Sequence, residues 1–320
     1  MSNKEVFGRI ASLEELKHVR GVVFHIVHGS FVDGYGIRTT VFLKGCPLRC
    51  KWCCNPEGQM PYRELRFKRD LCNGCGRFLM RCPYGAITMD DLEGKIEVNR
   101  SLCSNCLLCT EACFNGALGI FGEIMTAGEV FEIAKRDLSF YRKSGGGVTI
   151  GGGEPTFQPV FSLALIRLCH SEGISVAVDT CGYATGPLRF AVLEEADLIL
   201  FDLKGIDREK HKRNTGVFND VILTNLRTLD KLNKTLIIRI PLIPRHNYDS
   251  DELKKAAVLL SSLANVKRVD LLPYHRYGIS KYRELGRPYP LKEDESLSPQ
   301  QVYAVAEMFI KYGLKVQIGG

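Results

Sequence analysis

Three closely spaced cysteines, Cys46, Cys50 and Cys53, are the feature of this 320-residue sequence that most restricts its fold. Three and then two residues separate them, so their thiols can reach different irons of one cluster while the chain makes a tight loop. A four-iron cluster normally takes four cysteine thiolates. A loop with three thiols therefore leaves one iron open to a small chelating molecule, as catalytic metal sites keep one position free. A zinc knuckle is the alternative, although zinc sites favour paired cysteines.

A second group of cysteines lies between residues 59 and 123, a segment whose apolar runs are too short for a core of their own. The segment contains seven cysteines: Cys72, Cys75, Cys82, Cys103, Cys106, Cys109 and Cys113. The last four have the two, two and three intervening residues of a bacterial ferredoxin run. Bound metal is therefore expected to hold this segment together, with a structural zinc site as the alternative to iron–sulfur clusters.

The first half of this segment is incomplete, because Phe78 stands where the third cysteine of its run belongs. In two-cluster ferredoxins the fourth cysteine of each run ligates the other cluster. The spacing predicts one complete set and one set that lacks a ligand, namely Cys103, Cys106, Cys109 with Cys82, and Cys72, Cys75 with Cys113. For the second set, four alternatives stay open: a three-iron cluster, a non-cysteine ligand, a borrowed thiol such as Cys54, and no cluster at all.

Composition narrows the class of protein further. Apolar residues make up 45% of the chain, which is enough for a sizeable core. No run approaches the roughly 18 to 20 apolar residues that cross a bilayer. The first residues, Met1 to Glu5, contain no apolar signal region, so a cytoplasmic protein without a membrane partner is expected. The 13 cysteines, an odd number, indicate metal ligation rather than a disulfide framework.

The net charge gives little support to a nucleic-acid partner. The formal value of +7 counts every cysteine as neutral. Clusters held by thiolates contribute about −1 or −2 each, so three of them would lower the total to roughly +3. The chain also lacks the Lys/Arg run that marks a nucleic-acid-binding arm. We therefore expect a protein partner or an acidic electron carrier.

Strands and helices alternate along most of the chain. Thr126 and Glu129 form a capping box that opens a helix expected to reach about Tyr141. Strands are expected at residues 21–27, 39–44, 144–154, 174–179, 197–204, 235–239, 267–272 and 314–318, and helices at 13–17, 126–141, 160–171, 188–195, 220–233, 250–263 and 299–312. This alternation predicts a parallel sheet covered by helices, curled into a full or partial barrel. The expected division is 1–58 (start of the barrel), 59–123 (inserted iron–sulfur domain) and 124–320 (rest of the barrel).

Several predicted strands end in residues that suit a small polar ligand. Gly151, Gly152 and Gly153 would let a ligand approach the backbone, and Glu154 directly after them could hold an ammonium group. The next strand ends at Asp179 with Thr180. A carboxylate at a strand end can bind ribose hydroxyls or a cation. A surface ion pair at a strand terminus is the alternative for each carboxylate taken alone.

Later strands add a cation and an imidazole. Asp202 and Lys204 lie on one face because strand side chains repeat every two residues, and Lys204 could pair with a ligand carboxylate. His275 follows a later strand and could lie beside an aromatic ligand group, although a lone histidine is more often structural. Arg239 and Asn247 are weaker candidates.

Together these motifs resemble the glycyl-radical-enzyme activating enzymes, a branch of the radical S-adenosylmethionine (SAM) superfamily. The resemblance extends from Gly21 to Gly320. It is carried by the turn Asp33 to Thr39, in which Tyr35 stands where the family usually has proline, the loop Gly45 to Glu57, the ferredoxin-like segment, Gly145 to Pro155, Asp179 to Gly182, Asp202 to Lys204, Lys210–His211, Thr215–Gly216 and Leu271 to His275. It implies an α/β fold, a partial (β/α)6 TIM-like barrel with an inserted ferredoxin-like domain.

The resemblance also implies an activity and a set of roles. In the family, the three-cysteine 4Fe-4S cluster cleaves SAM reductively, and the resulting 5′-deoxyadenosyl radical takes a hydrogen from a backbone glycine of a partner glycyl radical enzyme. The roles that it implies are Gly152, Gly153 and Glu154 at the SAM amino group, Lys204 at its carboxylate, Asp202 and His275 at the ribose and adenine, and Asp179, Thr180 and Asp202 at a monovalent cation.

Partners follow from the same resemblance. A flavodoxin or ferredoxin is expected to supply the electron, by way of one or two auxiliary clusters, to a monomeric enzyme that serves a lyase, a decarboxylase or a fumarate-adding enzyme. Three alternatives remain: another radical SAM enzyme that acts on a small molecule or RNA, an electron-transfer iron–sulfur protein, and a zinc-dependent nucleic-acid-binding module. An electron-transfer protein would not need Lys204 and the carboxylates at the strand ends.

Overall fold

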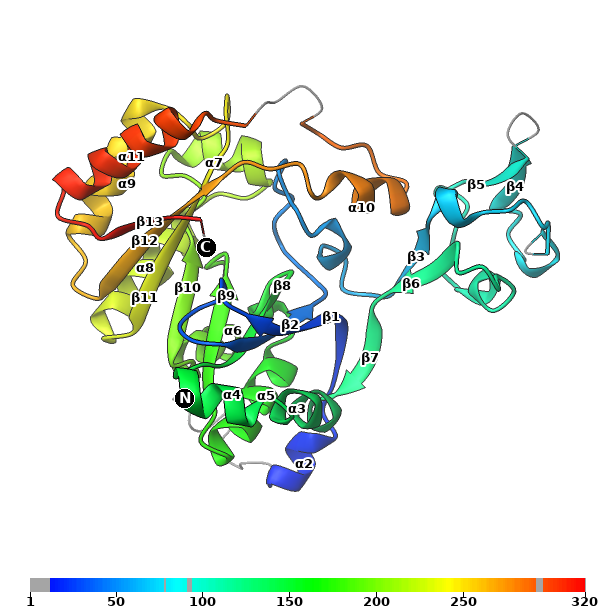
Figure 1. Ribbon diagram of the computed structural model, residues 1–320, viewed down its shortest axis with the longest axis horizontal. Helices are drawn as coiled ribbons and strands as arrows, with labels where there is room; N and C mark the ends of the chain where they lie inside the picture. The colour runs from blue at the N-terminus through cyan, green and yellow to red at the C-terminus, as the bar shows by residue number, and fades with distance from the viewer. Residues whose placement is uncertain (1–11, 78, 91–93, 292–295, 320) are drawn as a thin grey trace.

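A nine-stranded sheet forms the body of the protein in the computed structural model, which describes residues 12–77, 79–90, 94–291 and 296–319. The strands are β1 (Arg20–Ser30), β2 (Arg38–Leu43), β7 (Glu123–Thr126), β8 (Gly147–Gly152), β9 (Ser175–Thr180), β10 (Leu198–Asp202), β11 (Thr235–Leu242), β12 (Val266–Pro273) and β13 (Val316–Ile318). Their order is β13-β12-β11-β10-β9-β8-β2-β1-β7. All neighbours from β2 to β13 pair in parallel, whereas β1 pairs antiparallel with both β2 and β7. The predicted α/β fold with a mostly parallel sheet is confirmed, and its two edges leave the barrel partial (Figure 1).

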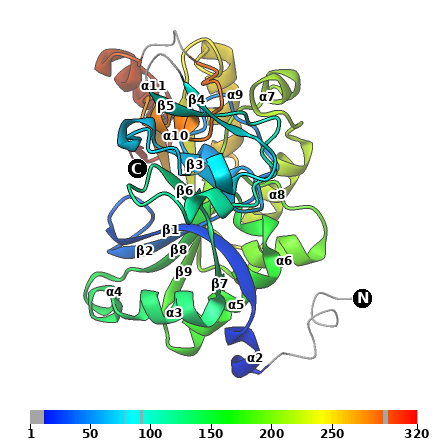
Figure 2. The same ribbon diagram turned by 90° about the vertical axis from the view of Figure 1, so that its right-hand side faces the viewer.

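The helices cover the outer face of this sheet, with one exception (Figures 1 and 2). They are α2 (Leu13–Lys17), α3 (Ala127–Lys135), α4 (Leu138–Ser144), α5 (Pro159–Ser171), α6 (Pro187–Glu195), α7 (Arg208–Thr215), α8 (Asp220–Lys231), α9 (Ser250–Ser261), α10 (Ile279–Glu284) and α11 (Pro299–Lys311). The exception is α10, which lies apart from the sheet and contacts the turn Pro56–Gly58 and the inserted segment. Short 3-10 turns lie at Pro56–Gly58, Arg69–Leu71, Leu79–Arg81, Leu108–Thr110 and Pro155–Phe157. None of the helices in the described ranges is long and apolar enough to cross a membrane.

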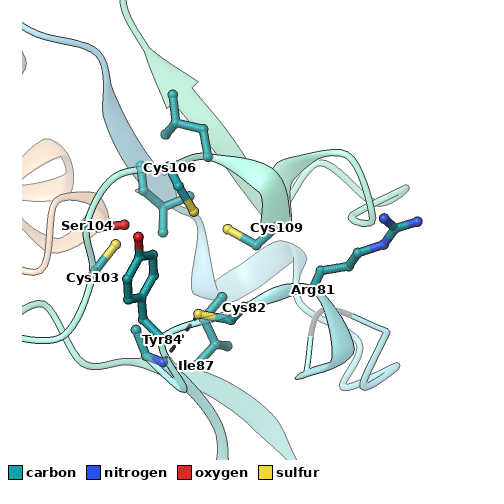
Figure 3. A pocket seen from close by; sticks show the side chains of 11 residues that line it. Arg81, Cys82, Tyr84, Ile87, Cys103, Ser104, Cys106 and Cys109 are labelled. Carbon is teal, nitrogen blue, oxygen red and sulfur yellow. Dashed lines mark hydrogen bonds between the residues drawn. The ribbon is translucent and has the colours of Figure 1, made fainter.

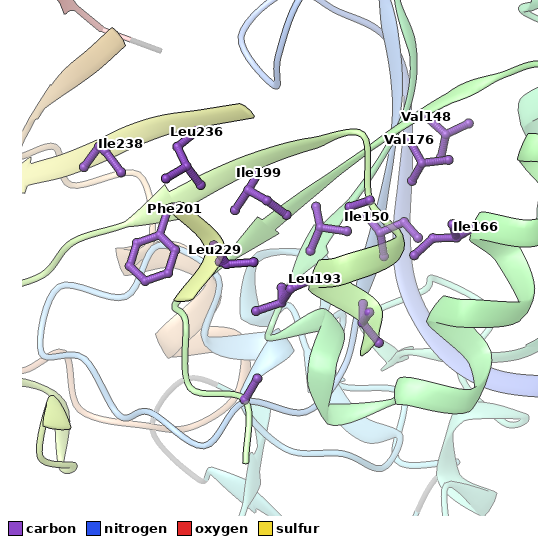
Figure 4. Close-up of a cluster of buried hydrophobic side chains, with 14 of the residues drawn as sticks. Val148, Ile150, Ile166, Val176, Leu193, Ile199, Phe201, Leu229, Leu236 and Ile238 are labelled. Atoms are coloured by element: carbon purple, nitrogen blue, oxygen red, sulfur yellow. The ribbon is translucent and has the colours of Figure 1, made fainter. Parts of the chain in front are cut away.

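Period-two alternation separates the two faces of the sheet. In β10, Ile199 and Phe201 belong to the main core beneath the helices (Figure 4). Leu198 and Leu200 instead form a small separate cluster with residues of β9 and β11. The next position on that second face is Asp202. The concave face therefore changes from apolar to charged toward the carboxyl ends of the strands.

Several elements differ from their predicted bounds: β1 extends to Ser30, β11 extends to Leu242, and β10 ends at Asp202 rather than at Lys204. Two further differences have a visible cause. The helix expected from Thr126 to Tyr141 keeps its capping box but breaks between α3 and α4. At the break, the Asp137 carboxylate bonds the His28 ring and the Thr39 hydroxyl, both at 2.5 Å, so tertiary contacts redirect the chain. The strand expected from residue 144 begins only at Gly147, because α4 runs to Ser144.

The inserted segment folds as two small antiparallel sheets that project from the barrel (Figures 1 and 2). They pair β3 (Glu64–Phe67) with β6 (Leu118–Phe121), and β4 (Ile87–Asp90) with β5 (Lys95–Val98). Its core consists of six buried side chains: Leu65, Ile87, Ile96, Leu107, Cys109 and Leu118. Other cysteines of the insertion pack against this core. The predictions that concern Phe78 and the leader before residue 12 lie outside the described residues.

Candidate active site

The loop of residues 45–58, which carries the three spaced cysteines, begins where β2 ends. The N–H of Gly45 donates to the carbonyl of Gly58 at 2.7 Å, and the N–H of Cys46 donates to that of Gln59 at 3.0 Å. These bonds join the two ends of the loop. All three thiols are partly buried, and they stand at the carboxyl end of a parallel strand, where barrel folds place their chemistry.

Helix α7, which was not predicted, holds the middle of this loop. The N–H of Arg49 donates to the carbonyl of Thr215 at 2.7 Å, and the N–H of Lys51 donates to that of Asn214 at 3.0 Å. The signals for this helix were present in the sequence. Asp207 accepts a hydrogen bond as its N-cap, and a glycine in the left-handed region follows its last residue.

The segment after β12 packs on the other side of the loop. Trp52 lies in an apolar cluster with residues of this segment, including Tyr274 and Tyr282. Lys281 of α10 pairs with Glu57 at 2.6 Å. The cysteine loop is therefore clamped between α7 and α10, neither of which the helix pattern predicted.

Gly152 and Gly153 bring the end of β8 against the cysteine loop. The φ of Gly152 is +103°, and a Cβ on Gly153 would overlap the carbonyl oxygens of Gly45 and Gly58. The N–H of Glu154 donates to the Gly45 carbonyl at 2.8 Å. Backbone packing alone therefore requires glycines here. Their contact with a ligand stays a prediction.

The carboxylate of Glu154 is fully buried and joins β8 to β9. It accepts hydrogen bonds from the Thr180 hydroxyl (2.9 and 3.0 Å), the Cys181 N–H (2.7 Å) and the Thr156 N–H (3.1 Å). The single hydrogen of the Thr180 hydroxyl is shared between both oxygens, so three donors serve a carboxylate that has about four lone-pair sites. The predicted contact of Glu154 with an ammonium group stays a prediction.

Arg239 lies among the carboxylates of the concave face. Its Nη1 is 3.1 Å from Asp179 Oδ2 and 3.9 Å from Asp33 Oδ1, and its Nε is 3.8 Å from Asp202 Oδ1. Lys204 donates to Asp202 Oδ2 at 2.7 Å. The sequence indicated the carboxylates and Lys204 but ranked Arg239 low. In the structure, Asp202 lies directly opposite Arg239 in the β10–β11 register, so Arg239 shares the concave face with the carboxylates.

Burial and the charges of their neighbours set the protonation of these acidic and basic side chains. Burial raises the pKa of Asp179 to about 7, because the nearby Arg239 only partly offsets the cost of a buried charge. Burial lowers the pKa of Lys204, but the charge of Asp202, with a further contribution from Cys50 once it is deprotonated, outweighs burial and holds the pKa well above its ordinary value. A fixed cation at this end of the sheet suits a ligand with a carboxylate.

His275 and Asn247 have different surroundings. His275 is exposed after β12 and stacks on Tyr277 with ring centroids 4.4 Å apart. Partial burial lowers the pKa of His275, which favours the neutral ring. The Asn247 amide accepts from the Ile243 N–H at 2.7 Å and donates to the Pro241 carbonyl at 2.5 Å. Asn247 thus closes the turn after β11, which is a structural role.

The cysteines of the insertion gather around two separate cavities. The first is lined by Cys82, Cys103, Cys106 and Cys109, whose sulfurs surround it in Figure 3. The second is lined by Cys72, Cys75 and Cys113. This is the grouping that the ferredoxin spacing predicts, although the ligation itself stays a prediction.

Hydrogen bonds to sulfur support cluster ligation in the insertion. The Ala86 N–H donates to Cys82 Sγ at 3.3 Å, and the Leu118 N–H donates to Cys113 Sγ at 3.2 Å. Such bonds stabilise thiolates that hold iron. Within the described part of the chain, no three Cys, His, Asp or Glu side chains come close enough to hold a single metal ion. The thiols of a cluster bind different irons and stand further apart, so these donor sets fit clusters better than a zinc ion.

Comparison with known proteins agrees with this chemistry. A model of the radical SAM superfamily matches residues 103–257, one of a 4Fe-4S dicluster domain matches residues 64–114, and one of a 4Fe-4S single cluster domain matches residues 32–85. The choline trimethylamine-lyase activating enzyme of Oleidesulfovibrio alaskensis is 38% identical over 93% of this chain and 98% of its own length. The isethionate sulfite-lyase activating enzyme of the same organism is 41% identical over 89% of this chain and 93% of its own.

Activating enzymes named for other partners are similar over a comparable length. The 4-hydroxyphenylacetate decarboxylase activating enzyme of Clostridioides difficile is 34% identical over 95% of this chain and 97% of its own. The chain belongs to the glycyl-radical-enzyme activating enzymes of the radical SAM superfamily. Among solved structures, a domain of the pyruvate-formate lyase-activating enzyme from Bacteroides vulgatus is 31% identical, with a TM-score of 0.47, over 55% of this chain and 99% of its own. Family membership also decides the class: the chain is a SAM-dependent enzyme rather than an electron-transfer protein or a zinc module.

The thiols of this activating enzyme fit the cluster that its family uses. Burial raises the pKa of Cys50 to about 12 and that of Cys53 further, so both thiols are neutral until a metal replaces the proton. A hydrogen bond with Cys181 lowers the pKa of Cys46 despite its burial. Cys181, which the sequence reasoning did not consider, therefore lies beside the first cluster thiol.

Proposed function

We propose that this chain activates a glycyl radical lyase, dehydratase or decarboxylase through the residues at the carboxyl ends of its parallel strands. One observation carries the proposal: the Glu154 N–H bonds the Gly45 carbonyl of the cysteine loop, and the Glu154 carboxylate bonds Thr180 at the end of β9, beside the strand that ends in Asp202. A cluster held by Cys46, Cys50 and Cys53 would supply, when bound, the electron that cleaves SAM to a 5′-deoxyadenosyl radical. The chain's own residues bind and orient the nucleotide and exclude water from it.

The roles divide by charge. Lys204 offers its ammonium to the SAM carboxylate, because its protonated state is secured by Asp202. The SAM amino group lies at Gly152, Gly153 and Glu154, whose carboxylate has three donors for about four lone-pair sites. Asp202 also reaches the ribose.

Two further groups complete the proposed site. His275, neutral and stacked on Tyr277, flanks the adenine. Asp179, Thr180 and Asp202 take up a monovalent cation, which would offset the accumulated negative charge near Asp179. The partner's glycine enters through the open side of the barrel, and glycine suits this entry because it lacks a side chain.

The relatives support a partner of the lyase, dehydratase or decarboxylase type, since their names include trans-4-hydroxy-L-proline dehydratase and indoleacetate decarboxylase activating enzymes. We also propose a flavodoxin or ferredoxin as electron donor and a monomeric enzyme, which leaves the mouth of the barrel free for the partner. A reducing cytoplasmic setting is supported by the 13 free cysteines.

The decisive experiment measures SAM cleavage and glycyl radical formation separately. Anaerobically reconstituted protein with dithionite should release 5′-deoxyadenosine, and the Cys50→Ala variant should release none above background. With a glycyl radical lyase, dehydratase or decarboxylase as partner, the parent protein should also give the glycyl radical doublet by electron paramagnetic resonance (EPR). Release of 5′-deoxyadenosine by Cys50→Ala at the parental rate would refute the site. Cleavage without a glycyl radical would refute the partner.

A further inference from the structure

We propose that the second cavity of the insertion holds a four-iron cluster in which one iron has no ligand from this chain and binds a small anionic ligand from solvent. The proposal rests on the family's iron–sulfur chemistry, but it does not require the SAM reaction to occur. It makes this second site chemically different from its neighbour. The complete cluster only accepts and passes electrons, whereas the second one also exchanges a ligand.

The second cavity has three thiols and more room than the first. Cys72, Cys75 and Cys113 line it, and its volume is about 150 Å³, whereas the cavity of the four-thiol set measures about 10 Å³. Cys113 Sγ accepts the Leu118 N–H at 3.2 Å, as Cys82 Sγ accepts the Ala86 N–H in the complete set. The cavity therefore offers three thiols to iron and leaves space for a further group.

No good fourth ligand is available among the described residues of the cavity wall. Besides the three cysteines, the wall consists of Leu71, Asn73, Arg77, Ile96, Phe114, Asn115 and Ala117. It therefore presents no carboxylate, imidazole or fourth thiol, which are the side chains that ligate iron most readily. The Asn73 side-chain oxygen already accepts the Cys75 N–H at 3.3 Å. Phe78, which replaces the expected cysteine in the sequence, has no donor atom.

The wall also indicates what the open iron binds. Cys75 is exposed, and the Phe114 ring is 79% exposed, so small solutes reach the cavity. Arg77 stacks over the Phe114 ring at 5.0 Å and brings a positive charge to the wall. Soft sulfur or carbon donors suit iron–sulfur centres. The ligand is therefore a small anion, hydroxide by default and a softer anion where one is present.

An iron that only sulfide and a weak ligand hold is labile on oxidation. The expected reaction is loss of Fe²⁺ and one electron, so that [4Fe–4S]²⁺ becomes [3Fe–4S]⁺, with ferricyanide as the oxidant that accepts the electron. The complete cluster has a thiolate on every iron and should resist this loss. The two sites of the insertion can thus be distinguished in a single sample.

The test uses the full chain with Cys46, Cys50 and Cys53 replaced by Ala, because the SAM cluster has an open iron of its own and would give the same signal. After anaerobic reconstitution, this variant should contain about eight irons in two four-iron clusters. One equivalent of ferricyanide should release about one iron and produce one [3Fe–4S]⁺ EPR signal per chain. In the dithionite-reduced protein, cyanide should shift one of the two cluster spectra.

A variant that restores the missing cysteine of the second ligand set provides the matched control. Phe78→Cys in the same background should abolish both the ferricyanide signal and the cyanide shift, because every iron then has a thiolate. Met80→Cys adds a thiol at a fully exposed position that does not line the cavity, and it should change neither. Cys113→Ala should remove the labile signal and keep the complete cluster.

Three results would overturn the proposal. Only about four irons per chain would mean that the second site is empty. Eight irons that all resist ferricyanide would mean that another group ligates the open iron, and Asn115→Ala would then show whether the Asn115 amide does so. Unchanged spectra in Phe78→Cys would place the labile iron elsewhere. None of these measurements depends on SAM cleavage, so a failure of this proposal can be told apart from a failure of the proposed function.

Discussion

Single residues at the mouth of the barrel carry charges that depend on one another. Arg239 lies among Asp33, Asp179 and Asp202, and Lys204 is paired with Asp202. Burial would favour the neutral form of each group alone. Together they keep Lys204 protonated while burial raises the pKa of Asp179 to about 7. A change at one of these residues therefore alters how the others bind ligands.

Lys204→Met should weaken SAM binding more than it weakens folding. Met retains the length of the side chain but removes the cation that would pair with the SAM carboxylate, and it leaves the Asp202 carboxylate facing that group. A hydrogen bond to a charged group contributes about 1.5–3 kcal/mol, so the Kd for SAM should rise about 10- to 100-fold. Calorimetric titration of the reconstituted protein measures this, with Lys204→Arg as a partial rescue. An unchanged Kd would exclude Lys204 from the SAM site.

Glu154→Gln tests the link between β8 and β9. An amide presents two N–H donors on one side, so the buried N–H of Cys181 or Thr156 would lose its acceptor. A buried unsatisfied donor costs about 1–3 kcal/mol, and the free energy of unfolding in urea should fall by that amount. The exposed Glu132→Gln should change it by less than about 0.5 kcal/mol. If both variants unfold alike, the Glu154 carboxylate does not hold the strands together.

Among the helices and strands, sequence patterns predicted those features that interactions between neighbouring residues produce. Period-two and capping patterns found the parallel strands and the start of α3, because those features are written in neighbouring residues. The break after α3 depends on contacts of Asp137 with residues about 100 positions away, which no local pattern contains. For the same reason the strand ends revealed the carboxylates, while the three donors to Glu154 and the clamp of α7 and α10 on the cysteine loop could not be foreseen.

The junction between the insertion and the barrel contains a buried ion pair whose contribution to the free energy of unfolding can be measured. Lys44 at the end of β2 is fully buried, and its Nζ is 3.0 Å from the Glu64 carboxylate of β3. Arg287, after α10, also bonds Glu64. Three parts of the chain therefore meet at one carboxylate, between the first cluster loop and the insertion.

Glu64→Leu should destabilise this junction strongly, because it leaves Lys44 buried without a charge partner. Breaking one side of a buried ion pair costs about 3–5 kcal/mol. The double variant Lys44→Met/Glu64→Leu should recover most of the loss, since an apolar pair of similar size is nearly neutral. Urea unfolding followed by circular dichroism measures both. If the double variant is no more stable than Glu64→Leu, the pair does not explain the burial of Lys44.

At the scale of the whole molecule, the two parts are held together by different forces. The barrel has an apolar core that spans its sheet, and its cysteine loop is fastened by backbone hydrogen bonds that need no metal. In the described part of the insertion, the apolar core cluster has six buried side chains, packed against cysteines. A core of that size cannot offset the conformational entropy of a segment of about 60 residues, so the clusters must contribute folding free energy there.

Removing the iron should therefore unfold the insertion and leave the barrel folded. After treatment with ferricyanide and a chelator, brief trypsin digestion should cut at basic residues of the insertion, such as Arg77, Arg81 and Lys95, and mass spectrometry should recover an intact fragment from the barrel that follows it. Protein with its clusters should resist cutting at these sites. Far-ultraviolet circular dichroism should keep most of its signal, because the main sheet and its helices lie outside the insertion. Equal cutting in both parts would show that the clusters stabilise the whole chain, and resistance of both would show that the small core of the insertion suffices without metal.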